Sequence, residues 1–200
     1  MIPWLLLLFA YLLGGVPFGY LLVKLKTGED VRSMGSGNIG ATNVVRTTGR
    51  AIGILTLLLD IGKGYLSVWL MARFTGSDVL WTSAAAVVVM LGHAFPIFLK
   101  FKGGKAVASF IGAYLALAPA PLFACLALLV IVVAVTRYIS LGSILAAGLF
   151  PFAVWLILHP AWPLLLSALF SGAFIVWRHR ANISRLRAGN EHVFTFGSRK

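Results

Sequence analysis

Long apolar stretches, separated by short polar segments, fill almost the whole 200-residue chain. A helix needs about 20 apolar residues to cross roughly 30 Å of hydrocarbon. Because no stretch is left over for a soluble region, we expect an all-α integral membrane protein that forms a single domain over residues 1–200. Marked at the length of a membrane span, the pattern predicts about seven transmembrane helices, over residues 2–23, 51–72, 79–99, 106–119, 120–136, 139–158 and 161–177.

The boundary between the fourth and fifth helices depends on the stretch Ala118-Pro119-Ala120-Pro121. Proline lacks a backbone N–H and clashes with the preceding turn, so it can end a helix. Residues 106–136 would be far too long to span a membrane once as a single helix. Two short spans fit the pattern better.

The composition agrees with this fold class, since 60% of the residues are hydrophobic and only 11% are charged. Soluble domains carry about 25% charged residues. The hydropathy therefore argues against a nucleic-acid partner, even though the net charge is +12. Anionic lipid headgroups are a simpler partner for most of the cations. The single cysteine, Cys125, has no second cysteine for a disulfide, so we expect it to pack in the core.

The distribution of the positive charge predicts the orientation in the membrane. If residues 24–50, 100–105, 137–138 and 178–200 share one side, that side holds 15 of the 17 Lys and Arg residues, with Arg73 opposite and Lys63 inside a span. Positive residues favour the cytoplasmic side. We therefore expect the N-terminus outside and the C-terminus in the cytoplasm. The 15 residues are Lys24, Lys26, Arg32, Arg46, Arg50, Lys100, Lys102, Lys105, Arg137, Arg178, Arg180, Arg185, Arg187, Arg199 and Lys200.

A glycine-rich segment, residues 35–43, lies on this predicted cytoplasmic side. It matches the dinucleotide fingerprint G-x-G-x-x-G, but no βαβ unit surrounds it, so a Rossmann site is disfavoured. Glycines let backbone amides approach an anion, and a helix N-terminus attracts one. If a short re-entrant or interfacial helix begins near Asn38, then Asn38, Thr42 and Arg46 share one face. The alternative is a capped helix whose arginine faces lipid phosphates.

A second polar segment, Gly103-Gly104-Lys105, follows Gly92-His93-Ala94-Phe95-Pro96 on the same side. We expect the two glycines to open the fourth helix and Lys105 to lie in its first turn. A cation there opposes the helix macrodipole, unless a bound anion satisfies both. Snorkelling of a lysine to the interface is the alternative, and it explains Lys100 and Lys102 well.

A third polar segment extends the last span from Arg178 to Glu191. If the helix continues, His179 and Asn182 lie three residues apart on one face, and Asn182 and Arg185 share a second stripe with Arg178. The competing explanation is an amphipathic surface helix.

The second span contains two ionisable residues, Asp60 and Lys63. Such groups are expensive inside a membrane and usually face the bundle interior or a cavity. An ion pair between neighbouring turns and a functional site are both compatible with their spacing.

The polar residues limit the chemistry of a site. The chain has no serine–histidine–carboxylate trio on a nucleophile elbow and no metal-ligand spacing of the H-E-x-x-H type. It has only five acidic residues. A site rich in cations and donors but poor in bases suits two anionic reactants, because positioning and charge stabilisation can then supply most of the rate.

The polar segments resemble the three signature motifs of the bacterial acyl-phosphate-dependent glycerol-3-phosphate acyltransferases. The seven-span layout and the element Asp60-x-x-Lys63-Gly64 resemble that family too, and the resemblance covers essentially the whole chain. The residues that carry it are Gly35-Ser36-Gly37-Asn38-Ile39-Gly40-Ala41-Thr42-Asn43 with Arg46, Gly92-His93-Ala94-Phe95-Pro96 with Gly103-Gly104-Lys105, and His179-Arg180-Ala181-Asn182-Ile183 with Arg185 and Glu191.

The resemblance implies a reaction in phospholipid synthesis. The 1-hydroxyl of glycerol 3-phosphate attacks the carbonyl of acyl phosphate, giving 1-acylglycerol 3-phosphate (lysophosphatidic acid) and phosphate. It implies no cofactor, metal, coenzyme A or carrier protein, because the donor is a mixed anhydride whose own phosphate is thought to take the proton. We expect a monomer in the bacterial cytoplasmic (inner) membrane, surrounded by membrane lipids, with its site facing the cytoplasm.

The resemblance also implies roles for individual residues. The glycine-rich segment and Lys105 would hold acyl phosphate, and the third segment would orient glycerol 3-phosphate. Ala106 stands where the family usually has glycine, so its methyl could crowd a backbone contact to phosphate. The implied catalytic residues are Ser36, Arg46, Lys105, His179 and Asn182. The implied substrate-binding residues are Gly37, Asn38, Gly40, Thr42, Asn43, Gly103, Gly104 and Arg185.

Two other classes of function compete with this one. A transporter for an organic phosphate would use Asp60 and Lys63 near the bilayer midplane, within paired repeats of broken helices. No inverted repeat is evident in the sequence, and the donors crowd one surface. A lipid-binding scaffold without catalysis would leave the glycine-rich segments unexplained.

Overall fold

A computed structural model describes residues 1–194, and within this range the secondary structure is helical throughout. The predicted all-α class is therefore confirmed. The chain divides into two compact units, Met1–Leu117 and Ala118–Lys200. The boundary falls at the stretch of alternating alanine and proline, where Pro119 opens a new helix. The expectation of a single domain stays a prediction.

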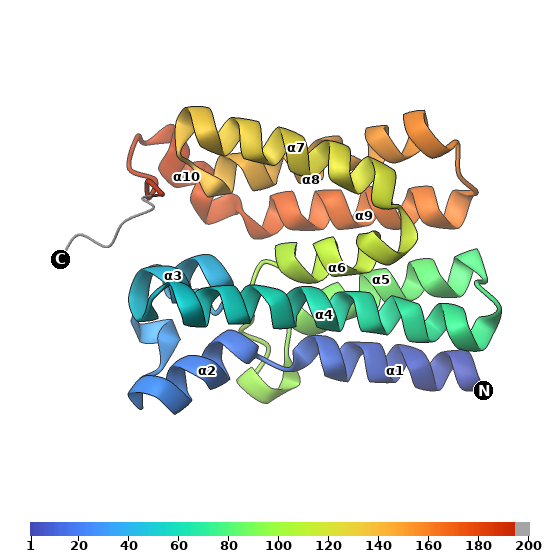
Figure 1. Ribbon diagram of the computed structural model, residues 1–200, viewed down its shortest axis with the longest axis horizontal. Coiled ribbons are helices and arrows are strands. Elements are labelled where there is room, and N and C mark those ends of the chain that lie inside the picture. The colour runs from blue at the N-terminus through green and yellow to red at the C-terminus, as the bar shows by residue number, and fades with distance from the viewer. Residues whose placement is uncertain (195–200) are drawn as a thin grey trace. The chain divides into compact units, whose positions relative to one another are not determined.

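The first unit is a bundle of long helices with short helices at one end (Figure 1). Figure 1 shows α2 and α3 at the end of this unit away from the N-terminus. Its helices are α1 (Ile2–Gly15), α2 (Phe18–Thr27), η1 (Val31–Ser33), α3 (Ala41–Thr48), α4 (Arg50–Thr75), α5 (Val79–Ala94), η2 (Ile97–Leu99) and α6 (Val107–Leu117).

The first apolar stretch is broken, and the expected single helix over residues 2–23 is wrong in this respect. Helix α1 ends at Gly15, and α2 begins at Phe18. Pro17 lacks an N–H for the helix and forces the residue before it out of the helical region. Val16 accordingly has an extended ψ of 115°. The break leaves the carbonyl of Val16 available to another donor.

Glycines bring the long helices of the first unit into close contact. A methyl group at Gly14 of α1 would lie 2.3 Å from the carbonyl oxygen of Val89 in α5. Likewise, a methyl at Gly112 of α6 would lie 1.9 Å from the carbonyl oxygen of Ile61 in α4. Small residues at such crossings let helix backbones approach, which is a common basis of packing within membranes.

The fourth predicted span is shorter than expected. Helix α6 has 11 residues rather than the 14 of the range 106–119, so at 1.5 Å per residue it is about 16 Å long. The last long helix, α9, has 17 residues. Among the described residues, five segments are long and apolar enough to cross a membrane: Ile2–Thr27, Arg50–Thr75, Val79–Leu99, Pro119–Thr136 and Ile139–Leu158. The count of seven spans stays a prediction.

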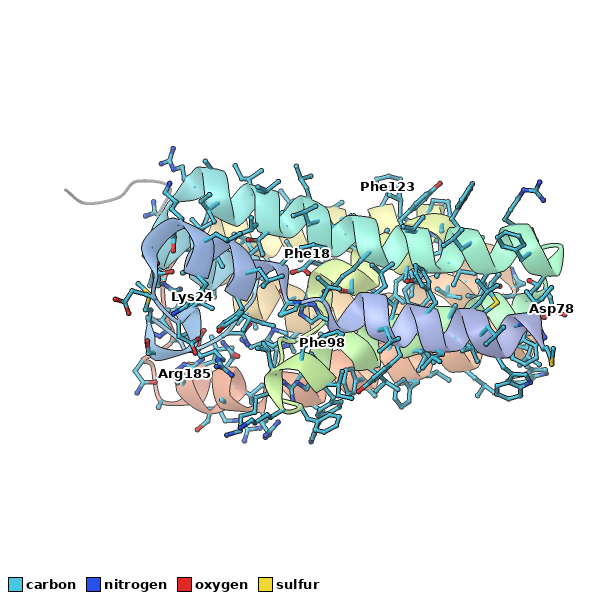
Figure 2. All side chains as sticks on the ribbon, turned by 90° about the horizontal axis from the view of Figure 1, so that it is seen from below. Phe18, Lys24, Asp78, Phe98, Phe123 and Arg185 are labelled. Carbon is cyan, nitrogen blue, oxygen red and sulfur yellow. The ribbon has the colours of Figure 1, made fainter. Side chains whose placement is uncertain are left out.

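Lys24 and Asp78 lie at opposite ends of the first unit. Figure 2 shows Lys24, in the last turn of α2, at the opposite end from Asp78, which caps α5. The end with α2 and α3 has a small apolar core that joins these helices to η1 and η2. Its buried members are Val23, Val31, Ile39, Val44 and Leu99. This core fixes the glycine-rich segment to the unit.

Up to residue 194, the second unit contains three long helices and one short helix. They are α7 (Pro119–Thr136), α8 (Ile139–Leu158), α9 (Trp162–Arg178) and α10 (Arg180–Arg187). Helices α8 and α9 pack closely, since a methyl at Gly172 would lie 2.4 Å from the carbonyl oxygen of Ala147. Cys125 of α7 is buried, as expected for a core residue.

Candidate active site

Asn43, on α3, holds the glycine-rich loop (residues 35–40) in place. Its side chain is only 2% exposed. Its Oδ1 accepts the N–H of Ser36 at 2.8 Å, while its Nδ2 donates to the carbonyl oxygens of Met34 at 3.1 Å and Asn38 at 2.9 Å. One side chain therefore pairs with two backbone groups of the loop and with that of Met34, directly before it. We had expected Asn43 to bind substrate directly; the structure gives its amide group internal partners.

Two glycines of this loop have backbone conformations that favour glycine. The φ angles are +56° at Gly35 and +70° at Gly37, in the left-handed region. The N–H of Gly37 donates to the carbonyl of Met34 at 2.9 Å, and the N–H of Gly40 donates to Oδ1 of Asn38 at 2.8 Å. These amide groups are paired inside the protein, so the glycines shape the loop.

Helix α3 begins later than the sequence suggested. We expected a start near Asn38, but the first helical residue is Ala41, and Gly40 before it is extended with ψ 159°. The prediction that Asn38 shares a helical face with Thr42 and Arg46 is therefore wrong. The side chain of Asn38 instead accepts the N–H of Gly40 in a turn. Thr42 and Arg46 do share a face of α3, and both are exposed.

The start of α3 has properties that suit an anion. Gly40 at the N-cap has no side chain to accept a hydrogen bond from the first turn, so the helix relies on other acceptors for its orphan N–H groups. Ser36, Thr42 and Arg46 are exposed in the same short segment. Arg46 lies in the last turn of α3 rather than at its start. A helix N-terminus without a side-chain cap, close in sequence to two hydroxyls, is a typical arrangement for binding phosphate, and a guanidinium on the same short helix can add charge.

The second glycine pair lies against the C-terminal end of α5. The N–H of Gly103 donates to the carbonyl of Ala94 at 3.2 Å, and the N–H of Gly104 donates to that of His93 at 3.1 Å. A methyl at Gly104 would lie 2.2 Å from Nε2 of His93, and one at Gly103 would lie 2.2 Å from its carbonyl oxygen. Close packing on His93 therefore requires glycine at both positions.

Lys105 precedes α6, whereas we expected it in the first turn of that helix. Helix α6 starts at Val107, and Ala106 before it has φ +65°, which is incompatible with a right-handed helix. The carbonyl of Ala106 accepts the N–H of Phe110 at 2.8 Å and so begins the helix. Lys105 is half-buried at this turn.

Asp60 and Lys63 form a buried ion pair on α4. Their side chains are 3% and 1% exposed, and Lys63 Nζ lies 2.7 Å from Asp60 Oδ1. The sequence-based possibility of a pair between neighbouring turns is confirmed. His93 belongs to the same cluster, since its Nδ1 lies 3.6 Å from Asp60 Oδ1.

In the second unit, His179 and Asn182 are buried near the junction of α9 and α10. The chain turns at His179, where φ is −94° and ψ is 9°, so the two helices are separate. Nδ1 of His179 lies 2.8 Å from the carbonyl oxygen of Ile175. A carbonyl only accepts, so this nitrogen carries the hydrogen, and Nε2 of the neutral ring is then an acceptor.

Glu191 fixes the side chains of Asn182 and Arg185. Asn182 Nδ2 donates to its Oε1 at 2.7 Å, and Arg185 Nε donates to its Oε2 at 2.8 Å. Ser140 of α8 also donates to Oε1, at 3.1 Å. Because the carboxylate takes the NH₂ end of Asn182, the amide oxygen points away from it. That oxygen is buried and has no hydrogen-bond partner among residues 1–194.

Comparison with known proteins identifies the family to which the chain is similar. The family model for glycerol-3-phosphate acyltransferase matches residues 4–189. The glycerol-3-phosphate acyltransferase of Geotalea daltonii is 46% identical over 94% of this chain and 96% of its own length. That of Trichlorobacter lovleyi is 48% identical over 92% of this chain and 94% of its own length.

The chain belongs to the glycerol-3-phosphate acyltransferase family. Two crystal structures of an integral membrane glycerol 3-phosphate acyltransferase agree with it in fold. Its glycerol 3-phosphate form has a TM-score of 0.93 and 37% identity, and covers 98% of this chain and 96% of that one. Its lysophosphatidic acid form has a TM-score of 0.89 and 36% identity, with the same coverage. The predicted family, the acyltransferase class and the membrane-integral fold are confirmed.

Three residues of this acyltransferase had no assigned role in the sequence analysis. His93 shapes the turn before Lys105, Glu191 orients two implied substrate ligands, and Ser140 anchors that glutamate. Glu191 and His93 stood within the motifs, so the signal was present. Ser140 gave none, because a serine in an apolar helix usually bonds to its own backbone.

Proposed function

We propose that this acyltransferase takes its acyl group from acyl phosphate and transfers it to the 1-hydroxyl of glycerol 3-phosphate. In this proposal the protein is a monomer with seven spans in the bacterial inner membrane, and its site faces the cytoplasm. The observation that carries the proposal is the start of α3, which no side chain caps, near exposed Ser36 and Thr42, with exposed Arg46 in the last turn of the same short helix. It provides donors and positive charge, as a phosphorylated reactant requires.

The donor phosphate is assigned to the first unit. Ser36 and Thr42 supply hydroxyl donors, and Arg46 supplies a guanidinium that can bind phosphate in a bidentate manner. Lys105 supplies a second cation, placed at a tight turn. Charge that develops on the carbonyl oxygen and the departing phosphate is stabilised by these groups.

Glycerol 3-phosphate is assigned to the second unit. This substrate has two hydroxyl donors and one anionic phosphate. Nε2 of His179 and Oδ1 of Asn182 are acceptors for the hydroxyls, as the hydrogen bonds of Nδ1 and Nδ2 require. Arg185 is the cation for the phosphate. Its Nε binds Glu191, and its side chain is still 32% exposed.

The reaction needs no base from the protein in this account. The 1-hydroxyl oxygen forms a bond to the acyl carbonyl carbon, and the bond from that carbon to the phosphate oxygen breaks. The hydroxyl proton passes to the departing phosphate. The protein contributes position and charge stabilisation.

The structure argues against the alternative of an organic-phosphate transporter. It required Asp60 and Lys63 to face a substrate path, but these side chains are paired with each other and almost fully buried. We therefore retain the acyltransferase assignment for the polar segments.

A substitution of Lys105 tests this proposal. In Lys105→Ala we expect the rate of phosphate release to fall by at least ~100-fold, because transition-state charge stabilisation is lost. The assay uses purified protein in detergent with acyl phosphate and glycerol 3-phosphate. Lys102→Ala removes an exposed lysine from the same loop and serves as the matched control.

Two outcomes of this assay would contradict the proposal. Near-normal turnover by folded Lys105→Ala would remove this lysine from the mechanism. Formation of 1-acylglycerol 3-phosphate by the unaltered protein only when acyl coenzyme A replaces acyl phosphate would overturn the assignment of the donor.

A further inference from the structure

The buried cluster of Asp60, Lys63 and His93 lies in the interior of the first unit. Ionisable groups inside membrane helices are costly, and they persist where they have a specific task. Buried ion pairs contribute little net stability compared with apolar side chains of similar size. Stability alone therefore does not account for this cluster.

Lys63 connects the cluster to the break between α1 and α2. Its Nζ donates to the carbonyl oxygen of Val16 at 3.0 Å. This carbonyl is at the break that Pro17 creates. The ammonium group also lies 5.6 Å from the centre of the Phe18 ring, a residue that Figure 2 marks near the middle of the unit. Lys63 thus holds both sides of the break.

Asp60 connects the cluster to the end of α5. Its Oδ1 lies between Lys63 Nζ, at 2.7 Å, and His93 Nδ1, at 3.6 Å. The imidazole is 4% exposed, so the carboxylate restricts a ring that has little room to move. A hydrogen bond of 2.8 Å from the hydroxyl of Tyr11 to the carbonyl of Phe95 fixes the same end of α5 to α1.

His93 in turn determines the path of the chain just before Lys105. Its carbonyl accepts the N–H of Gly104, and its ring leaves no space for a side chain there. Gly103 is held in the same way by the neighbouring carbonyl of Ala94. With both glycines fixed, the position of Lys105 follows from the backbone.

We infer that Asp60, Lys63 and His93 form a positioning cluster for Lys105. Through His93, the cluster sets the backbone of Gly103 and Gly104, and so the place from which the lysine reaches the substrate. None of the three touches substrate in this account. The inference rests on the proposed role of Lys105.

A double-mutant cycle between His93 and Lys105 tests the inference. We expect His93→Gln to lower kcat roughly 10-fold to 100-fold, because small displacements of a catalytic group have effects of this size. KM for glycerol 3-phosphate should change much less. In a Lys105→Ala background the same substitution should change kcat less than about 2-fold, because residues that act through one another are not additive.

Gly104→Ala is a second variant that leaves His93 in place. Its methyl would meet the imidazole, so the turn must move, and we expect the same non-additivity with Lys105→Ala. His159→Gln is the matched control, since this exposed histidine lies in the second unit and should leave kcat unchanged. Monodispersity and melting temperature in detergent show whether each variant is folded.

The outcomes separate this inference from the proposed function. Additive effects of His93→Gln and Lys105→Ala would overturn the positioning role and leave Lys105 in the mechanism. Full activity of folded His93→Gln and Gly104→Ala would also overturn it. Full activity of Lys105→Ala would overturn both the inference and the proposed role of the lysine.

Discussion

Ala106 has a backbone conformation that usually belongs to glycine. Its φ of +65° places an L-residue in the left-handed region, and its side chain is buried with 1% exposed. The left-handed conformation costs an L-residue roughly 1–2 kcal/mol. The glycine expected here from the family resemblance therefore has a conformational reason, in addition to the crowding of phosphate that the sequence suggested. In this chain the strained residue directly follows Lys105.

Substitutions at Ala106 should show this cost. In Ala106→Gly the backbone strain disappears, but the unfolded chain gains entropy worth about 0.4–1 kcal/mol. We therefore expect stability to change by less than about 1 kcal/mol, with activity retained. Ala106→Val adds a β-branched side chain at positive φ and should reduce both stability and kcat. Thermal unfolding in detergent and kcat are the measurements, and an active, stable Ala106→Val would contradict the account.

Asn43 shows a limit of sequence reasoning at this scale. An asparagine in a glycine-rich segment is compatible with substrate binding and with loop support. Only the closed loop reveals that its amide reaches Ser36, Met34 and Asn38. Whether Asn43 supports the loop or binds substrate depends on the path of the backbone. Gly35 and Gly37, both in the left-handed conformation, set that path.

At the scale of a single element, α4 has a polar stripe along its buried face. Thr56, Asp60, Lys63 and Ser67 are all nearly inaccessible. The two hydroxyls bond to carbonyls within the helix, Thr56 to Ile52 and Ser67 to Lys63. The ion pair has its further partners outside α4. Lys63 bonds to the carbonyl of Val16, and Asp60 lies near the imidazole of His93.

Single and double substitutions of this pair should differ strongly. Lys63→Ala leaves a buried carboxylate and should cost about 3–5 kcal/mol, whereas Asp60→Leu with Lys63→Met should be nearly neutral or stabilising. The unfolding free energy, measured by thermal or steric-trap methods in detergent, distinguishes them. The stable double variant should still have low kcat, because His93 loses its partner. A double variant less stable than Lys63→Ala would contradict this prediction.

Helix α10 depends on the carboxylate of Glu191. Burial opposes the ionisation of this group, but hydrogen bonds from Asn182 and Arg185 outweigh it, and the pKa of Glu191 is lowered. The ionised carboxylate therefore stabilises the arrangement. A lowered pKa in the folded state contributes stability above the ordinary pKa of glutamate, and this contribution is lost as pH falls through the folded pKa.

The attachment of α10 should accordingly weaken on acidification. We expect hydrogen exchange of its backbone amides to be slow at neutral pH and to accelerate below the ordinary pKa of glutamate, after correction for intrinsic rates. Glu191→Gln should exchange faster at neutral pH and lose most of this dependence. Identical pH profiles for the two proteins would show that another group is responsible.

At the scale of the whole molecule, hydropathy predicted the helical membrane class and the approximate position of every long helix. It placed the boundary between the fourth and fifth helices within two residues, because proline gives a local signal, although Pro119 opens α7 instead of ending α6. Pro17 gave the same signal, yet the apolar run on both sides concealed the break. A hydropathy pattern describes the environment of a segment and not its continuity.

Polar contacts between distant residues could not be read from the sequence. Lys63 and Val16, Asp60 and His93, and Ser140 and Glu191 are brought together by packing alone. Close helix crossings at glycines, such as Gly92 of α5 against Tyr11 of α1, contribute to this packing. The pattern of each helix identifies a buried face but does not identify the helix that covers it.

The measurement that tests the account most directly is the membrane side of the three polar segments. Single cysteines in place of Ser36, Lys102 and Arg180, in a Cys125→Ser background, are labelled with an impermeant thiol reagent. Right-side-out and inverted vesicles are compared, with Arg73→Cys as the control for the opposite side. We expect the three cysteines to react from the cytoplasmic side alone and Arg73→Cys from the other. Reaction of Ser36→Cys and Arg180→Cys from opposite sides would contradict the account, because no common pair of substrates could then meet both segments.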